Sequence, residues 1–191
     1  MALEAAQDGR PDGRVVIVTG ASSGLGRATA IEFANMGCKV ICADIRPDAP
    51  SGETVTTHDF IYKTSSGQAH FVRTDVTESS EVEALIQEAI KTYGRLDVIV
   101  NNAGISLESK LGAKSIEDTE DTTFDLTMRV NTRSVFLGSK YAIRQFLAQD
   151  SHPSGSRGWI VNISSIYGLV GASGHGGTLT FGKLRKALLL T

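Results

Sequence analysis

The sequence is poor in cysteine and has no hydrophobic run long enough to cross a membrane. Its two cysteines, Cys38 and Cys42, lie on or beside one expected strand, so they cannot form a disulfide scaffold, and a reduced, cytoplasmic setting is expected. The segment Met1–Pro11 is polar and lacks the apolar core of a signal peptide. Membrane attachment is therefore not predicted.

An excess of charge of one sign is also absent. The chain has 19 basic and 21 acidic side chains, a formal net charge of −2, and no basic stretch that would favour nucleic acid as a partner. Of its 191 residues 41% are hydrophobic, which suits a single α/β domain of ordinary core size. No metal site is predicted.

The first informative stretch is a strand, a glycine-rich turn and the start of a helix. Val15–Val18 is a continuous β-branched run, typical of a strand that is buried on both faces. Glycines follow at Gly20, Gly24 and Gly26, and the helical pattern then extends to about Gly37. Such a turn brings bare backbone N–H groups and the positive end of a helix against a phosphate.

The spacing of these glycines is the specific part of the signal, because glycines also occur in ordinary turns that bind nothing. The pattern Thr-Gly-x-x-x-Gly-x-Gly from Thr19 to Gly26 resembles the short-chain dehydrogenase/reductase family rather than the broader Gly-x-Gly-x-x-Gly pattern. The resemblance implies a nicotinamide dinucleotide cofactor. Along this turn it would be bound by Gly20, Ser22, Gly24, Leu25 and Gly26.

A carboxylate at the end of the next expected strand indicates which dinucleotide is bound. The strand Lys39–Asp44 ends on Asp44, whose oxygens can accept hydrogen bonds from both ribose hydroxyls of NAD and would repel the extra phosphate of NADP. NADP-binding members of the family often carry a basic residue before the second glycine, where this chain has Ser23. NAD is therefore predicted, with NADP less favoured. Arg46 lies close enough to weaken the distinction, and a turn-forming Asp before Pro47 is the alternative interpretation.

Two short motifs further along match the same family. Strands are expected at Ala69–Asp75 and Leu96–Val100, and the second is followed by Asn-Asn-Ala-Gly from Asn101. The resemblance places the Asp-Val pair beside the adenine ring and makes the Asn-Asn-Ala-Gly motif line the cofactor. The residues implied are Asp75, Val76, Asn102, Ala103 and Gly104.

The segments between the strands carry less information. Residues 46–68 are rich in Pro, Gly, Ser and Thr and are expected to form a long loop. Apolar residues at helical spacing predict a helix over Val82–Tyr93, for which Ser80 and Glu83 could form a capping box. Residues 107–123 are polar and show no strong periodicity.

Two polar residues are candidates for catalysis. Asn131 falls on the apolar stripe of a long helix beginning near Phe124, where a buried asparagine bonded to backbone is the ordinary interpretation. Its register in Val-Asn-Thr-Arg-Ser-Val-Phe resembles the family's helix asparagine, which holds a water connecting the active-site lysine to solvent. Ser165 follows a strand expected at Trp159–Ile163, and the resemblance makes it the serine that hydrogen-bonds the substrate oxygen. A serine making only turn bonds is the alternative.

The resemblance covers about residues 14–175 and implies a Rossmann-type α/β fold. This is a doubly wound parallel sheet with strand order 3-2-1-4-5 and right-handed crossovers. Family members continue through further helices and strands. We therefore expect one NAD(P)-binding domain over residues 1–191, with its C-terminal strands missing. The family usually forms homo-oligomers, an assembly that the missing strands place in doubt for this chain.

The acid–base pair of the family is missing from the sequence. It consists of a tyrosine about thirteen residues after the serine and a lysine four residues later, where this chain has Thr178 and Gly182. None of the four tyrosines is followed by lysine at the fourth position. After about His175 the sequence diverges, and residues 176–185 are expected to be a genuine tail, a retained intron or shifted-frame sequence.

Two functions follow from these features. The first is an oxidoreductase that transfers hydride between NAD(H) and a small carbonyl or alcohol substrate, impaired in this chain because Tyr-x-x-x-Lys is absent. The second is a non-catalytic NAD-binding module, or a truncated or frame-altered product. The first needs a tyrosine and a lysine, whereas the second needs only the first half of the chain.

Overall fold

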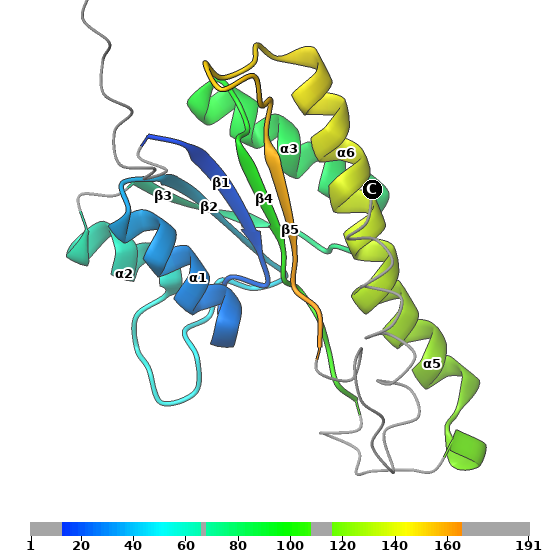
Figure 1. Cartoon of the computed structure of the whole chain (residues 1–191). Coiled ribbons are helices and arrows are strands. Elements are labelled where there is room, and N and C mark those ends of the chain that lie inside the picture. Colours follow the sequence, from blue (N-terminus) through cyan, green and yellow to red (C-terminus); the bar gives the residue numbers. More distant parts are fainter. Residues whose placement is uncertain (1–12, 66–67, 108–115, 166–191) are drawn as a thin grey trace, which may run out of the picture.

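The computed structural model describes residues 13–65, 68–107 and 116–165, which form a five-stranded parallel sheet with helices on both faces (Figure 1). The strand order is β3-β2-β1-β4-β5, so the predicted Rossmann-type order is confirmed. The strands are β1 (Val15–Thr19), β2 (Lys39–Asp44), β3 (Gln68–Arg73), β4 (Val98–Asn101) and β5 (Trp159–Asn162).

The central strand β1 is buried along its whole length. Ile17 pairs in register with Ile41 on one side and Ile99 on the other. Because side chains alternate along a strand, Val15 and Ile17 face one core and Val16 and Val18 face the other. The β-branched run seen in the sequence is therefore explained by two apolar layers rather than one.

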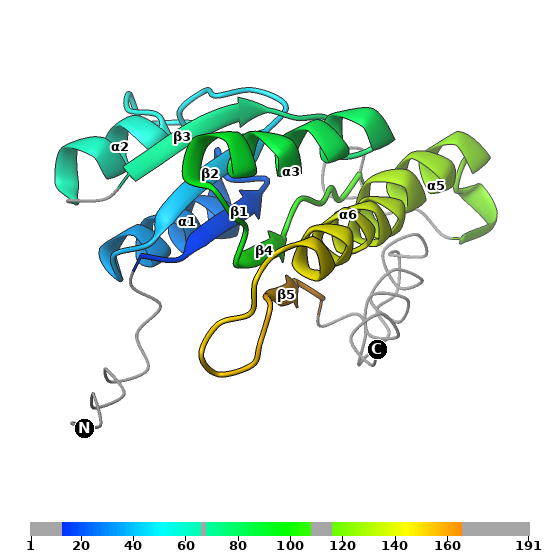
Figure 2. The same cartoon turned by 90° about the horizontal axis from the view of Figure 1, so that it is seen from above.

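Helices cover the two faces in pairs (Figure 2). On one face lie α1 (Gly24–Asn35) and α2 (Thr57–Thr64), which bury Ala30, Ala34 and Ile61 against β1 and β2. On the other lie α3 (Ser79–Tyr93) and α6 (Ser134–Ala148), whose buried residues join those of β1 and β4 in the second core. The glycine turn at the carboxyl edge therefore runs between the buried strand β1 and the packed helix α1.

The expectation of a continuous loop over residues 46–68 is wrong, because α2 lies within it. Thr56 caps this helix by accepting a hydrogen bond from the backbone N–H of Asp59 at 3.3 Å. Ile61 on the inner face of α2 is 1% exposed. The Pro and Gly content of the segment masked a short helix, which is stabilised by the burial of Ile61, by its side-chain cap and by hydrogen bonds of Thr57 to Arg27 and Ala21.

Two expectations about the other helices are also corrected. The N-cap of α3 is Glu78, so Ser80 and Glu83 lie inside the helix and do not form the predicted capping box. The long helix expected from Phe124 is present but begins at Asp121 and is not uniform: α5 (Asp121–Met128) continues into α6 through the π-helical turn η2 (Arg129–Arg133). A short 3-10 turn, η1 (Ile116–Asp118), precedes α5.

At the amino edge of the sheet a buried carboxylate joins three segments. Asp97, 1% exposed, accepts a hydrogen bond from the backbone N–H of Val15 at 2.8 Å through Oδ2. Its Oδ1 accepts from Nε of Arg95 at 2.6 Å and lies 2.9 Å from Nε2 of His152. These contacts fasten the start of β1 and the loop before β5 to β4, opposite the edge where the candidate site lies.

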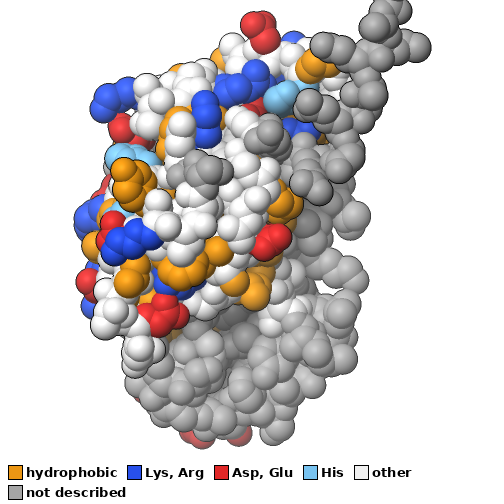
Figure 3. Space-filling model, turned by 90° about the vertical axis from the view of Figure 1, so that its left-hand side faces the viewer, with side chains coloured by type: hydrophobic (Ala, Val, Ile, Leu, Met, Phe, Trp, Pro, Cys, Tyr) orange, Lys and Arg blue, Asp and Glu red, His pale blue; other side chains and the backbone are white. Residues whose placement is uncertain are grey.

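The surface shows no segregation of charge on the face drawn in Figure 3, where basic and acidic side chains are interspersed. Among the helices that the structure describes, none combines the length and the apolar character required to cross a bilayer.

Candidate functional site

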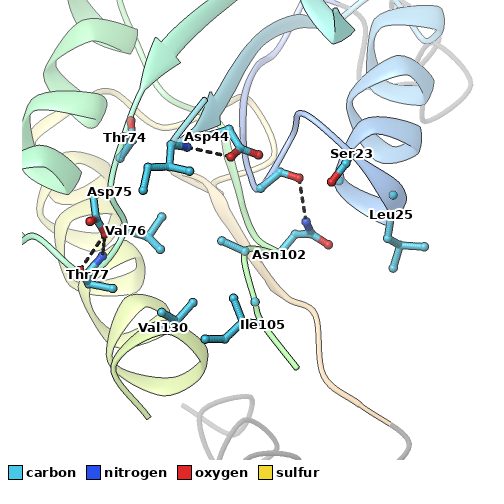
Figure 4. A pocket seen from close by; sticks show the side chains of 16 residues that line it. Ser23, Leu25, Asp44, Thr74, Asp75, Val76, Thr77, Asn102, Ile105 and Val130 are labelled. Atoms are coloured by element: carbon cyan, nitrogen blue, oxygen red, sulfur yellow. Dashed lines mark hydrogen bonds between the residues drawn. The ribbon is translucent and has the colours of Figure 1, made fainter. Parts of the chain in front are cut away.

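A cleft of about 540 Å³ opens at the carboxyl edge of the sheet, within the size range of ligand pockets (Figure 4). It lies where the chain order diverges from β1 to β2 on one side and to β4 on the other, the position at which open α/β sheets bind ligands. It is lined by Gly20, Ser23, Gly24, Leu25, Gly26, Asp44, Ile45, Thr74, Asp75, Val76, Thr77, Asn102, Ala103, Gly104, Ile105 and Val130.

One wall of the cleft is the glycine turn between β1 and α1. Gly20 has φ +68°, and a β-carbon there would lie 2.9 Å from Cα of Ala103. Gly24 has φ +51° and open space beside its α-carbon, so no residue that the structure describes fills the place of its missing side chain. The turn therefore presents backbone to the cleft and leaves room for a ligand to approach it.

The start of α1 adds an electrostatic preference to this wall. The first N–H groups of a helix have no partner within the helix, and the helix dipole is positive at that end. Ser23 is the N-cap and makes no side-chain capping bond, and the first turn of α1 carries no acidic residue. The wall therefore suits an anion such as a pyrophosphate.

Asp44 lies at the end of β2 and is held in place by backbone donors. Its Oδ2 accepts from the N–H of Ser22 at 3.0 Å and its Oδ1 from the N–H of Ile45 at 2.7 Å. Each carboxylate oxygen has capacity for a further hydrogen bond. Since Asp44 lines the cleft, it can accept hydroxyl groups of a ligand in a fixed orientation.

Asp75 and its neighbours form the opposite wall after β3. Oδ1 of Asp75 accepts from the N–H and the hydroxyl of Thr77 at 2.9 and 2.7 Å. The N–H of Asp75 donates to Oε2 of Glu81 in α3 at 2.8 Å, and the Arg133 guanidinium donates to the carbonyl of Thr77. This turn is therefore rigid, with Val76 facing the cleft (Figure 4).

Hydrogen bonds of Thr19 hold the floor of the cleft together. Its hydroxyl oxygen accepts from the N–H groups of Asn102 and Ala103 at 3.0 and 3.1 Å. The side-chain amide of Asn102 donates to the carbonyl of Thr19 at 2.9 Å. These bonds hold the Asn-Asn-Ala-Gly segment against the end of β1, and so against the glycine turn.

Asn131 reaches the cleft through another residue. It is 7% exposed in the π-helical turn η2, and it accepts from the N–H of Ile105 and donates to its carbonyl, both at 2.8 Å. Ile105 lines the cleft. Isolated π-helical turns are frequent at functional sites. Asn131 therefore fixes the end of the β4 segment, while the water-holding role that the resemblance implies stays a prediction.

Ser165 lies just beyond β5, at the same edge of the sheet. Asn162 at the end of β5 pairs in register with Asn101, and Ser165 is half-buried three residues later. It is not among the residues that line the cleft. Thr178 and Gly182, where the family would have its tyrosine and lysine, lie outside the described residues, as do Tyr167 and the divergent tail.

The structure brings together the residues that the sequence assigned to the cofactor, with the exception of Ser22. The Ser22 side chain faces away and donates to the carbonyl of Arg46 at 2.6 Å. The lining residues that sequence reasoning did not assign to the cofactor are Ser23, Ile45, Thr74, Thr77, Ile105 and Val130. Each of them directly adjoins a residue that the sequence singled out, Val130 being next to Asn131, so extending each motif by one position would have found them.

Cys42 in the buried middle of β2 does not contribute a nucleophile. Burial raises the pKa of the Cys42 thiol to about 12, against which the charge of Arg27 acts only in part. The thiolate, the reactive form, is therefore not populated near neutral pH.

Comparison with known proteins assigns a family. A family model described as short chain dehydrogenase matches residues 14–176. An oxidoreductase of Thermotoga maritima is 40% identical over 159 residues, which are 83% of this chain and 56% of that protein. A cyclopentanol dehydrogenase of Comamonas sp. is 35% identical over 166 residues, which are 87% of this chain and 60% of that protein. The chain thus spans little more than half the length of these relatives.

Solved structures of short chain dehydrogenases also resemble this chain. A short chain dehydrogenase from Mycobacterium smegmatis superposes with a TM-score of 0.82 at 30% identity, covering 94% of this chain and 70% of that one. A short chain dehydrogenase/reductase from Burkholderia phymatum, solved in complex with NAD, gives a TM-score of 0.80 at 26% identity and covers 94% of this chain and 58% of that one.

Proposed function

The chain belongs to the short-chain dehydrogenase family, and from that premise we propose that its cleft binds NAD for hydride transfer between NAD(H) and a small carbonyl or alcohol substrate. One observation carries the proposal: the glycine turn, Asp44, the Asp75–Val76 pair and the Asn102–Gly104 segment line a single cleft.

The residues present fit a dinucleotide. The glycine turn and the start of α1 offer unpaired N–H groups and open space to a pyrophosphate. Asp44 would accept the hydroxyls of the adenosine ribose, and Val76 would lie beside the adenine. The Asn102–Gly104 segment would line the remainder of the cofactor.

NAD is proposed over NADP because of the charge at the ribose end. Asp44 places a carboxylate there, held by the N–H groups of Ser22 and Ile45. Ser23 offers no cation to an additional phosphate. Arg46 is paired with Asp48, Nε to Oδ2 at 3.6 Å, and both side chains are mostly exposed. An exposed, paired arginine offsets little of the repulsion between Asp44 and a phosphate.

For the reaction itself, the bound nicotinamide would supply or accept the hydride. Ser165 is proposed to hydrogen-bond the substrate oxygen, and Asn131 to position the β4 segment through Ile105. Proton exchange with that oxygen requires a group of suitable pKa within hydrogen-bond reach. Because Tyr-x-x-x-Lys does not occur in the sequence, we propose that this chain is catalytically impaired.

A second candidate function is a non-catalytic NAD-binding module, or a truncated or frame-altered product. The absence of Tyr-x-x-x-Lys favours it, and the cleft satisfies its requirements. The two candidates share cofactor binding and differ in turnover. Under either, we propose a cytoplasmic protein.

Calorimetric titration of the 191-residue chain with NAD and, separately, with NADP tests the shared step. We expect saturable NAD binding with one site per chain and weaker NADP binding. AMP serves as a control ligand that engages only the adenosine end. Absence of NAD binding by a folded protein would overturn both the oxidoreductase and the NAD-binding module.

A further inference from the structure

Arg27, the residue after the last glycine of the turn, is buried and points away from the cleft. It is 7% exposed, and its Nη1 donates to the hydroxyl oxygen of Thr57 at 3.0 Å. Its Nη2 forms an ion pair with Glu53, and its guanidinium carbon lies 5.3 Å from the ring centroid of Phe60. These partners all belong to the segment 46–64, in which the sequence indicated no chemistry.

The contacts continue from this segment back to the glycine turn. The hydroxyl of Thr57 donates to the carbonyl of Ala21 at 2.7 Å. The hydroxyl of Ser22 donates to the carbonyl of Arg46 at 2.6 Å. Residues 46–57 are thus hydrogen-bonded to the turn at both ends. Between these ends, Glu53 forms the ion pair with Arg27.

Asp44 lies where the glycine turn and the segment bonded to it meet the cleft. The N–H of Ser22 that fixes Oδ2 belongs to the turn, and the N–H of Ile45 that fixes Oδ1 opens the segment. The backbone bond from Ala21 to the carbonyl of Ala43, 3.2 Å long, completes the link between turn and strand. If segment 46–57 moves away from the turn, the bonds from Thr57 to Ala21 and from Ser22 to Arg46 break, and the turn that carries the Ser22 N–H loses their support.

We propose that Arg27 is a positioning residue for cofactor binding: through Glu53 and Thr57 it holds segment 46–57 against the glycine turn and so keeps Asp44 oriented for the ribose hydroxyls. The inference deepens the proposed function and rests on it for the identity of the ligand. Arg27 touches no part of the cleft itself.

The chemistry of the side chain supports this role. An arginine fork can serve a carboxylate and a hydroxyl at once, whereas a lysine offers a point charge without the planar fork. Leaving Glu53 without its partner is not costly by itself, since its side chain is 48% exposed. The substitution instead removes the contacts by which Arg27 holds segment 46–57. This segment has few other buried contacts, and such segments open at low free energy.

Hydrogen exchange of the full chain without cofactor tests the clamp directly. In Arg27→Ala we expect amides of residues 45–57 to exchange about tenfold faster or more than in the wild type, which corresponds to about 1.4 kcal/mol of opening free energy. Arg27→Lys and Glu53→Gln should be intermediate, and they keep the test decisive if Arg27→Ala does not fold. Arg95→Ala is the matched control, because it removes an arginine paired with a carboxylate at the opposite edge.

Calorimetry with NAD supplies the second readout. We expect Arg27→Ala to weaken NAD binding about tenfold, Arg27→Lys to weaken it less, and Arg95→Ala to leave it within about twofold of the wild type. Equal exchange of residues 45–57 in Arg27→Ala and Arg95→Ala would overturn the clamp. Faster exchange in Arg27→Ala with unchanged NAD affinity would overturn its positioning role. A folded wild type that binds no NAD refutes the proposed function instead, and the exchange result then still decides whether the clamp exists.

Discussion

A β-carbon on Gly26 would lie 2.1 Å from the carbonyl oxygen of Gly20. It would also lie 2.5 Å from Nδ2 of Asn102, whose amide bonds β1 to the floor of the cleft. The backbone at both positions is fixed by the packing of α1 on the sheet and by the hydrogen bonds of Thr19. The last glycine of the turn is therefore required by the approach of α1 to β1 and β4, whether or not a ligand is present.

Gly26→Ala should accordingly reduce both stability and NAD binding. Relieving the collision requires α1 to shift, and overpacking of this kind typically costs about 1–3 kcal/mol. Urea unfolding and NAD calorimetry measure the two effects. Gly155→Ala is the control, since Gly155 has φ +85° with nothing within 4 Å and lies far from the cleft along the chain. It should lower stability through backbone strain alone and leave NAD affinity unchanged, and equal losses of affinity would contradict this account.

Asp44 should determine the preference between the two dinucleotides. Asp44→Ala removes the repulsion of an additional phosphate and two charge-assisted acceptors, so NAD binding should weaken by about 1–3 kcal/mol while NADP binding improves or holds. Parallel titrations of wild type and variant give the difference. Asp125→Ala is the control, because Asp125 is an exposed carboxylate on α5 that does not line the cleft. A wild type that binds NADP as tightly as NAD would refute the assignment.

Much of the fold could be predicted from the sequence because its strongest signals are local. The β-branched run of β1 and the end of the second strand on Asp44 required only short-range patterns, and the sheet order followed from the family resemblance. The prediction of a loop over residues 46–68 was wrong because the contacts that stabilise the helix there are not local. There α2 is held by the burial of Ile61 and by the contacts of Arg27 with Thr57 and Glu53, which a window of neighbouring residues does not contain.

The candidate site likewise has residues that local patterns predict and residues whose arrangement depends on distant parts of the chain. Lining residues within or beside motifs were accessible from sequence, whereas the orientation of Asp44 depends on Ser22, a residue distant in sequence. Asn131 stands out in the sequence as a polar residue on an apolar stripe, but its bonds to Ile105 join two segments that are distant in sequence. Asp97 carries no local signal in the sequence, because its partners Val15 and His152 are distant along the chain.

Alkaline pH should destabilise the fold through Cys42. Burial raises the pKa of this thiol to about 12 in the folded chain, whereas an unfolded thiol ionises near pH 8.5. A raised pKa means that the contribution is complete below about pH 8.5 and is lost as pH rises, since only the unfolded chain then releases its proton. The expected loss is about 1.4 kcal/mol per pH unit up to about pH 12.

Urea unfolding between pH 7 and pH 10.5 measures this loss in the wild type and in Cys42→Ala. Burial raises the pKa of Tyr93, and the charge of Cys42 raises it further, so Tyr93 adds a slope of the same sign that is smaller in Cys42→Ala. The difference between the two curves therefore reports Cys42 together with its effect on Tyr93, and it should shrink as pH rises because only the wild type loses these contributions. A difference that is constant with pH would show that the buried thiol is not linked to folding.

The last prediction concerns catalysis. The chain should show no appreciable turnover with NAD(H) and any ketone or secondary alcohol, even if it binds the cofactor. Ser165 and Asn131 can orient groups, but neither has a pKa suited to exchanging a proton with the substrate oxygen near neutral pH. General acid–base catalysis is typically worth about 10²–10⁴-fold, and loss of the lysine that would bind the nicotinamide ribose removes positioning as well.

The remaining candidate acid is Tyr167, two residues beyond Ser165 and outside the described residues. A phenol has an ordinary pKa near 10, so it acts poorly as a base at neutral pH unless a nearby cation lowers that value. Lysine is absent from the fourth position after Tyr167, where the chain has Gly171. Tyr167→Phe should therefore leave a negligible rate of NADH oxidation unchanged across a panel of ketones, with Tyr62→Phe as an exposed control. Robust turnover that disappears in Tyr167→Phe but persists in Tyr62→Phe would make Tyr167 the proton donor and the chain a working oxidoreductase.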